Sequence, residues 1–208
     1  MNAPDIFKMK RMYLFVTVVT FWRVAVFPIL IVTIWLRQLP LFSALLALSF
    51  LTDAVDGFLA RRYHVTSRTG AEWDSLGDDL TVAAAIIGMF VFRWDFIVQV
   101  QLFIFIVAAL FLIHTLAAVG RYGRLTSFHT WMAKASAVAQ AIFFLILFFS
   151  ASPPYVIFYV AVILTMLDLL EEIAMILSLD EWETDIRGWF DLRRRQKNRF
   201  SDHSHFPR

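Results

Sequence analysis

The chain has 208 residues, 60% of them hydrophobic, and its mean hydropathy of +0.67 is typical of a protein embedded in a lipid bilayer. It contains no cysteine, which excludes disulfides, thiolate metal ligands and cysteine nucleophiles, so any metal site must use oxygen or nitrogen atoms. Its formal net charge is +2, and the partners we expect for so apolar a chain are membrane lipids, with no nucleic acid.

Apolar stretches of about the length that crosses a hydrocarbon core recur along the chain. Before the first of them, residues 1–12 form a basic segment that fits a short interfacial helix and a disordered start equally well. The predicted spans are 13–36, 40–60, 74–92, 96–119, 131–150 and 155–178. We therefore expect an all-α membrane protein, with a bundle of six transmembrane helices over residues 13–179 and a charged cytoplasmic tail over 180–208.

Lysine and arginine residues are concentrated in alternate connections, and such residues mark the cytoplasmic side of a membrane protein. The opposite connections carry only Arg37 and Arg93. The basic residues gather in the N-terminal segment, in the second-to-third and fourth-to-fifth connections and in the tail, as Lys8, Lys10, Arg11, Arg61, Arg62, Arg68, Arg121, Arg124, Arg187, Arg193, Arg194, Arg195, Lys197 and Arg199. This predicts that both termini face the cytoplasm. If the source is bacterial, we expect the protein in the inner or plasma membrane.

Four aspartates stand at regular spacings where the second and third spans meet. Asp53 and Asp56 are three residues apart, and Asp74 and Asp78 are four apart, so each pair shares one face of its helix. Carboxylates near a bilayer are tolerated when they face a polar cavity and bind a cation. If the two spans pack side by side, the four carboxylates converge at the cytoplasmic boundary, where oxygen-only ligands favour one or two Mg²⁺ or Mn²⁺ ions.

Small residues punctuate the same stretch. Gly57, Ala60 and Gly70 remove side chains where a bulky ligand would approach the backbone, and Arg61 is placed to meet a phosphate. The alternative is that the aspartates are helix-end charges that offset nearby arginines, with the glycines serving close helix packing. We favour the ligand site, because ion pairing requires neither the matched spacing nor the interleaved glycines.

The whole pattern, Asp53-x2-Asp56-Gly57-x2-Ala60-Arg61-x8-Gly70-x3-Asp74-x3-Asp78, resembles the signature of the CDP-alcohol phosphotransferases at every fixed position. The resemblance implies a six-span fold and a metal-dependent phosphatidyltransferase of phospholipid biosynthesis, commonly a homodimer. Such an enzyme transfers a phosphatidyl group from CDP-diacylglycerol to a hydroxyl acceptor and releases CMP. A divalent-cation transporter is the non-enzymatic alternative.

The resemblance also implies a role for each residue of the signature. All four aspartates would ligate metal, Asp74 and Asp78 would act in catalysis, and Asp78 would be the general base. The CDP-linked donor would be bound by Asp53, Asp56, Gly57, Ala60, Arg61 and Gly70. Bound cations would neutralise the donor pyrophosphate, which otherwise repels an attacking oxygen.

Candidates for acceptor binding lie at the cytoplasmic ends of the fourth and fifth spans. Arg121, Arg124 and Lys134 are placed to bind the phosphate of glycerol 3-phosphate, although positive-inside anchoring explains the two arginines, and snorkelling explains Lys134, equally well. Thr20-x2-Arg23 and Ala133-Lys134-x-Ser136-x3-Gln140 are similar to segments of bacterial phosphatidylglycerolphosphate synthases, which usually have a second lysine in the latter stretch. Inositol phosphate, serine and phosphatidylglycerol are alternative acceptors.

Three acids, Asp168, Glu171 and Glu172, lie in the cytoplasmic half of the sixth span, where charged groups require partners. We expect Arg23 to pair with Asp168 or Glu171, as a structural lock or as part of an acceptor pocket. The basic run at 193–197 in the tail would attract anionic lipid headgroups, and a topology signal explains it equally.

Overall fold

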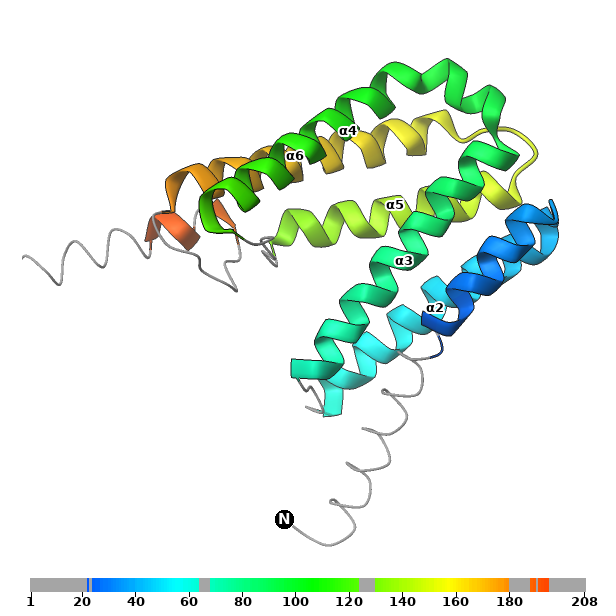
Figure 1. Ribbon diagram of the computed structural model, residues 1–208, viewed down its shortest axis with the longest axis horizontal. Helices are drawn as coiled ribbons and strands as arrows, with labels where there is room; N and C mark the ends of the chain where they lie inside the picture. The colour runs from blue at the N-terminus through cyan, green and yellow to red at the C-terminus, as the bar shows by residue number, and fades with distance from the viewer. Residues whose placement is uncertain are drawn as a thin grey trace, which may run out of the picture. The chain divides into compact units, whose positions relative to one another are not determined.

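The computed structural model of the chain (Figure 1) consists of long helices joined by short connections. It describes residues 22, 24–63, 68–123, 130–179, 188–189 and 191–194, with side chains described outside 56–75. The described residues contain no β-strand. The predicted all-α fold class is therefore confirmed for this part of the chain, while the predicted N-terminal segment 1–12 and most of the tail 180–208 lie outside it.

Each long helix overlaps one of the apolar spans that the sequence predicts. In chain order they are Val24–Trp35, α2 (Leu39–Tyr63), α3 (Arg68–Phe92), α4 (Trp94–Tyr122), α5 (Trp131–Phe149) and α6 (Tyr155–Ser178). The agreement follows from the apolar composition of the helices and from the polar or proline-containing connections between them, such as the two prolines before Tyr155.

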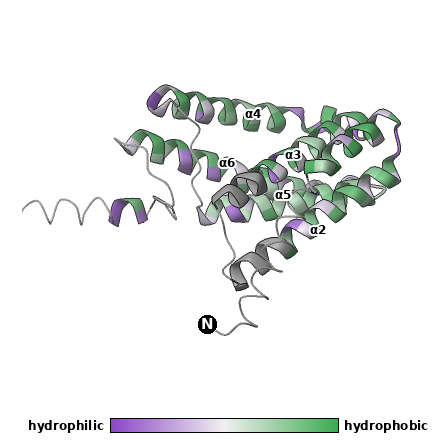
Figure 2. Ribbon diagram, turned by 60° about the horizontal axis from the view of Figure 1, so that its bottom comes forward, coloured by the Kyte–Doolittle hydropathy of each residue, from purple (hydrophilic) through white to green (hydrophobic). Residues whose placement is uncertain are grey.

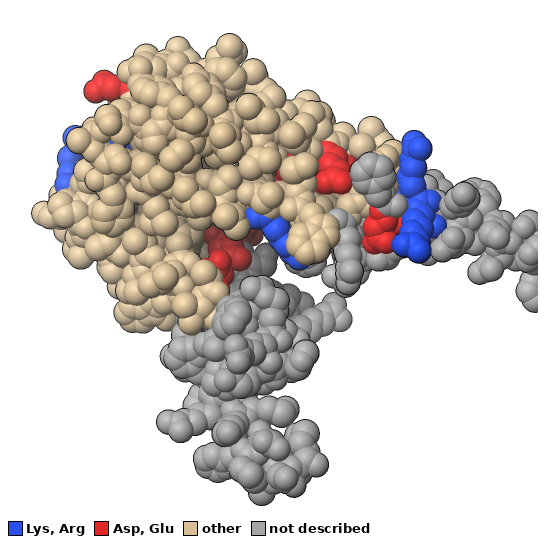
Figure 3. All heavy atoms as spheres, turned by 180° about the vertical axis from the view of Figure 1, so that it is seen from behind, with Lys and Arg blue, Asp and Glu red and all other residues tan. Residues whose placement is uncertain are grey.

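Within the described residues, α4 and α5 are the helices long and apolar enough to cross a membrane. Most of α4 is coloured hydrophobic in Figure 2, and it exposes large apolar side chains such as Leu102, Phe105 and Phe111. Residues other than Lys, Arg, Asp and Glu also make up most of the described surface drawn in Figure 3. Exposed apolar surface of this kind suits contact with lipid. The spans predicted in the other helices, and the side on which the termini lie, stay predictions.

The chain divides into two compact units. The first comprises Met1–Gln99 with Leu147–Ala151, and the second comprises Val100–Ile146 with Ser152–Arg208. The helices α4 and α5 each contribute residues to both units.

In the first unit, α2 and α3 pack against each other, as the short connection between them predicts. The fully buried Phe42 of α2 lies against Gly88 of α3, where an added β-carbon would stand 2.7 Å from the Phe42 Cε1 atom. The Phe42 ring also contacts Phe92 and Phe148, at centroid distances of 5.4 and 4.9 Å. Since Phe42 is near the start of α2 and Gly88 near the end of α3, the two helices run antiparallel.

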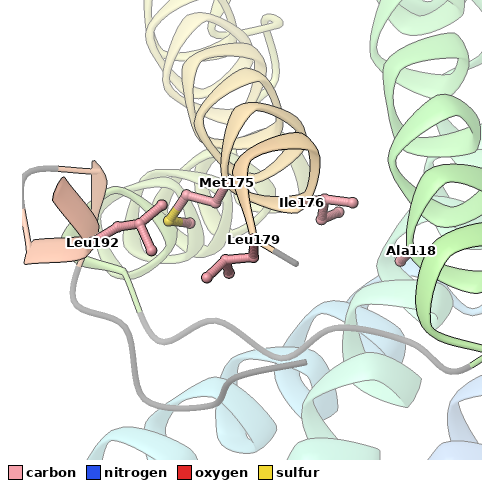
Figure 4. Close-up of a cluster of buried hydrophobic side chains, with 5 residues drawn as sticks. All are labelled: Ala118, Met175, Ile176, Leu179 and Leu192. Carbon is pink, nitrogen blue, oxygen red and sulfur yellow. The ribbon is translucent and has the colours of Figure 1, made fainter. Parts of the chain in front are cut away.

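In the second unit, aromatic pairs join the helices at one end and an aliphatic cluster joins them at the other. Phe103 of α4 contacts Tyr159 of α6, with ring centroids 5.1 Å apart. At the opposite end, the Tyr122 hydroxyl lies 3.0 Å from the carbonyl oxygens of Ile176 and Leu179. Figure 4 shows the aliphatic cluster there, formed by Ala118, Met175, Ile176, Leu179 and Leu192. The end of α4 and the end of α6 are thereby held together.

Candidate active site

The aspartates of the signature lie on the paired helices α2 and α3 of the first unit. The side chains of Asp53 and Asp78 are described, and both are half-buried. Asp56 and Asp74 are at helical positions, as the shared-face argument requires, but their side chains lie outside the described ones. The same holds for the predicted donor-binding residues Gly57, Ala60, Arg61 and Gly70.

On α2, Asp53 continues a stripe of buried residues. Phe42, Leu46 and Ser49 are each at most 1% exposed, and Asp53 follows Ser49 by four residues. Residues at these spacings lie on one face of an α-helix. Asp53 is therefore on the inward face of α2, about one turn beyond the last fully buried side chain.

On α3, Asp78 continues the corresponding stripe from the other direction. Thr81 and Ala85 are at most 5% exposed, Gly88 is buried, and Asp78 precedes Thr81 by three residues. The Thr81 hydroxyl donates a hydrogen bond of 2.8 Å to the carbonyl oxygen of Gly77, so this polar side chain is satisfied within its own helix. Asp78 is thus on the inward face of α3.

Asp53 and Asp78 lie at similar distances along their helices from the contact of Phe42 with Gly88. Asp53 lies eleven residues after Phe42, and Asp78 lies ten residues before Gly88. With a rise of about 1.5 Å per residue on antiparallel helices, both stand roughly 15 to 17 Å from this contact, toward the connection between α2 and α3. Among the side chains that the structure describes, no three acids or histidines come together as metal ligands, and Asp56 and Asp74 are not among these side chains.

The predicted acceptor residues belong to the second unit. Arg121 is exposed at the end of α4, where its Nε donates a hydrogen bond of 2.8 Å to the Leu179 carbonyl oxygen. Lys134 is exposed in the first turn of α5, with its Nζ 5.0 Å from the centre of the Trp131 ring. Arg124 lies outside the described residues. Both described side chains are thus accessible, and each already has a partner.

A cluster of buried polar side chains surrounds Asp168 in the second unit, and the sequence alone did not predict that they come together. Its carboxylate accepts hydrogen bonds from the hydroxyls of Thr130, at 3.3 Å, and Ser136, at 3.1 Å. The Thr130 hydroxyl also accepts a bond of 2.8 Å from the Ala133 N–H and so caps the start of α5. Thr130 and Ser136 are 0% and 3% exposed, so these bonds satisfy groups that would be costly to bury without partners.

The two other acids of α6 also find partners in the second unit. Glu172 Oε2 lies 2.9 Å from His114 Nε2 of α4. Glu171 Oε1 accepts a hydrogen bond of 2.9 Å from the backbone N–H of Trp189. The predicted partner Arg23 lies outside the described residues, so its pairing stays a prediction. Gln140 of α5 also donates a hydrogen bond of 2.8 Å to the Thr165 hydroxyl of α6. The sequence signal for this polar α5–α6 interface was the i, i+3 spacing of Thr165 and Asp168 and the i, i+4 spacing of Ser136 and Gln140.

Known proteins that resemble the chain act on CDP-activated lipids. A segment of 74 residues is 39% identical to the CDP-diacylglycerol--glycerol-3-phosphate 3-phosphatidyltransferase of Salmonella choleraesuis, and it covers 34% of this chain and 41% of that protein. Proteins of the same name from Pectobacterium atrosepticum and Salmonella paratyphi A are 39% and 38% identical over segments of the same length. The match thus spans less than half of these relatives. No solved structure matches the chain significantly.

The profile of the CDP-alcohol phosphatidyltransferase family matches residues 8–167. This range is well over half of the chain, and it includes all of α2 and α3 with their aspartates. The chain therefore belongs to the CDP-alcohol phosphatidyltransferase family.

Proposed function

We propose that this protein transfers a phosphatidyl group from CDP-diacylglycerol to glycerol 3-phosphate and releases CMP. The observation that carries the proposal is the presence of Asp53 and Asp78 on the inward faces of two paired helices in a chain of this family. The names of the similar bacterial proteins supply the donor and the acceptor.

The four aspartates would hold one or two divalent cations, Mg²⁺ or Mn²⁺. The donor set fits such ions, because it consists of carboxylate oxygens, and Asp53 and Asp78 are half-buried on neighbouring helices. Bound metal would supply positive charge that offsets the pyrophosphate and the charge that develops on departing CMP.

Asp78 on the third span would carry the proton transfer. The acceptor hydroxyl oxygen forms a bond to the phosphorus of the phosphatidyl group, while the bond from that phosphorus to the bridging oxygen breaks and CMP leaves with the electron pair. Asp78 accepts the hydroxyl proton as general base, next to Asp74. Gly57, Ala60 and Gly70 leave room for the nucleotide, and Arg61 meets its phosphate.

Acceptor binding is assigned to the basic residues of the second unit, Arg121, Arg124 and Lys134. The exposure of Arg121 and Lys134 at ends of α4 and α5 supports this assignment, because a soluble phosphate must reach them from water. Inositol phosphate, serine or phosphatidylglycerol would use the same chemistry at the donor phosphorus.

The protein would work as an integral membrane homodimer with six spans and with its aspartates facing the cytoplasm. The apolar helices α4 and α5 and their exposed hydrophobic side chains support the membrane location. The alternation of basic connections along the sequence supports the orientation.

The test is an acceptor panel. Purified protein in phosphatidylcholine vesicles receives labelled CDP-diacylglycerol with glycerol 3-phosphate, inositol phosphate, serine or phosphatidylglycerol, each in a separate reaction, and the lipid product is identified by mass spectrometry. We expect phosphatidylglycerol phosphate and CMP in equal amounts from glycerol 3-phosphate. If another acceptor gives the lipid product instead, that acceptor takes the place of glycerol 3-phosphate in the proposal. Failure to release CMP with any acceptor would contradict the transferase and favour cation transport.

A further inference from the structure

The C-terminal side of the second unit carries a short stretch of chain that packs onto the ends of α4 and α6. We call residues 188–189 and 191–194 the docked segment. Its Leu192 is 1% exposed and lies in the aliphatic cluster with Met175 of α6, Leu179 directly after α6 and Ala118 of α4 (Figure 4). Burial of this leucine side chain stabilises the docking of the segment.

Backbone contacts fix the direction in which the docked segment runs. The Trp189 N–H donates to Glu171 Oε1 at 2.9 Å, and the N–H groups of Asp191 and Leu192 both donate to the Gly188 carbonyl at 3.1 Å. Gly188 has a φ of +146°, and a β-carbon there would lie 3.1 Å from Glu171 Oε1. The turn at Gly188 therefore requires glycine, and the carboxylate of Glu171 faces the segment's backbone.

Leu192 and Trp189 of the docked segment face the aliphatic cluster, and its exposed residues are basic. Arg193 and Arg194 follow the buried Leu192 and are exposed. The Arg193 guanidinium lies 5.2 Å from the centre of the half-buried Trp189 ring. Arg195 and Lys197 come next in the sequence. Lysine and arginine residues are concentrated in the cytoplasmic segments next to membrane spans, where they can meet lipid headgroups.

We propose that the docked segment binds anionic phospholipid headgroups through Arg193 and Arg194, with the Trp189 ring supporting the Arg193 guanidinium. Leu192 holds the two arginines in a fixed position, so that they act as one site. A basic residue near an anionic membrane surface strengthens association about fivefold. The inference rests on the membrane location of the chain and does not require the transferase activity.

The test compares lipid binding by full-length variants in a neutral detergent. Native mass spectrometry measures the dissociation constants of phosphatidylserine and of phosphatidylcholine, since neither is a product of the proposed reaction with glycerol 3-phosphate. We expect tighter binding of phosphatidylserine by the unmodified protein and a loss of at least about tenfold in the double variant R193Q/R194Q. Arg37→Gln is the matched control, because Arg37 is also exposed but lies in a connection of the first unit.

A second variant separates a fixed site from a merely basic tail. Leu192→Ser keeps every arginine but removes the buried anchor, so hydrogen exchange of the backbone at 188–194 should rise and phosphatidylserine binding should weaken. The inference is overturned if R193Q/R194Q binds phosphatidylserine like the unmodified protein, if Leu192→Ser raises exchange without weakening binding, or if inorganic phosphate displaces the lipid at equal concentration. CMP release is measured on the same samples, and its absence would count against the proposed function alone.

Discussion

At the scale of single residues, and among those that the structure describes, the backbone at Arg37 departs most clearly from what its side chain prefers. Arg37 follows the helix Val24–Trp35 and has a φ of +54° in the left-handed region. Its N–H donates to the Ile34 carbonyl at 3.0 Å, and the Gln38 N–H donates to the Thr33 carbonyl at 2.9 Å. This pair of bonds is the Schellman motif, whose left-handed position usually holds glycine. A side chain there costs roughly 1 kcal/mol.

Replacing Arg37 by glycine should therefore stabilise the protein. We expect Arg37→Gly to raise the free energy of unfolding by about 0.5 to 1 kcal/mol, after allowance for the greater freedom of glycine in the unfolded chain. Denaturant unfolding in detergent measures the change. Arg37→Ala is the control, because it removes the same charge and keeps the unfavourable φ. Equal stability of the glycine and alanine variants would show that the backbone at this position is not strained.

At the scale of helices, the close approach of α2 to α3 depends on the absence of a side chain at Gly88. The buried Phe42 ring occupies the space that a β-carbon would need, and Phe92 and Phe148 restrict its movement. Because Asp53 and Asp78 lie on the same faces as this contact, a change in helix separation reaches both carboxylates. The pairing of α2 with α3 is thus required to position the two carboxylates as well as for stability.

Gly88→Ala should weaken the pairing. We expect it to destabilise the protein by roughly 1 to 3 kcal/mol, as overpacking of a buried contact does, and to lower CMP release. Gly120→Ala is the matched control, since Gly120 is also in a helix and nothing lies within 4 Å of its added β-carbon. That variant should keep or raise stability by up to about 1 kcal/mol. Thermal unfolding of both proteins decides the matter, and equal losses would refute the role given to Gly88.

At the scale of the whole molecule, local patterns were predictable and distant pairings were not. The helices follow from apolar runs, and the aspartate signature from spacing within 26 residues. By contrast, the partners of the three acids on α6 include His114 on α4 and Trp189 in the tail, which no spacing rule connects to Glu172 or Glu171. The left-handed residue at Arg37 was equally hidden, because glycine is the expected residue there.

The central claim is that the charges of Asp53 and Asp78 serve catalysis, and it is tested most directly by CMP release from CDP-diacylglycerol by three isosteric variants. Asp53→Asn and Asp78→Asn each remove one carboxylate from an inward helix face, and each should lower the rate at least about a hundredfold. Asp79→Asn changes the exposed neighbour outside the signature and should leave the rate close to that of the unmodified protein. Normal rates in the first two variants, or an equal loss in the third, would contradict the claim.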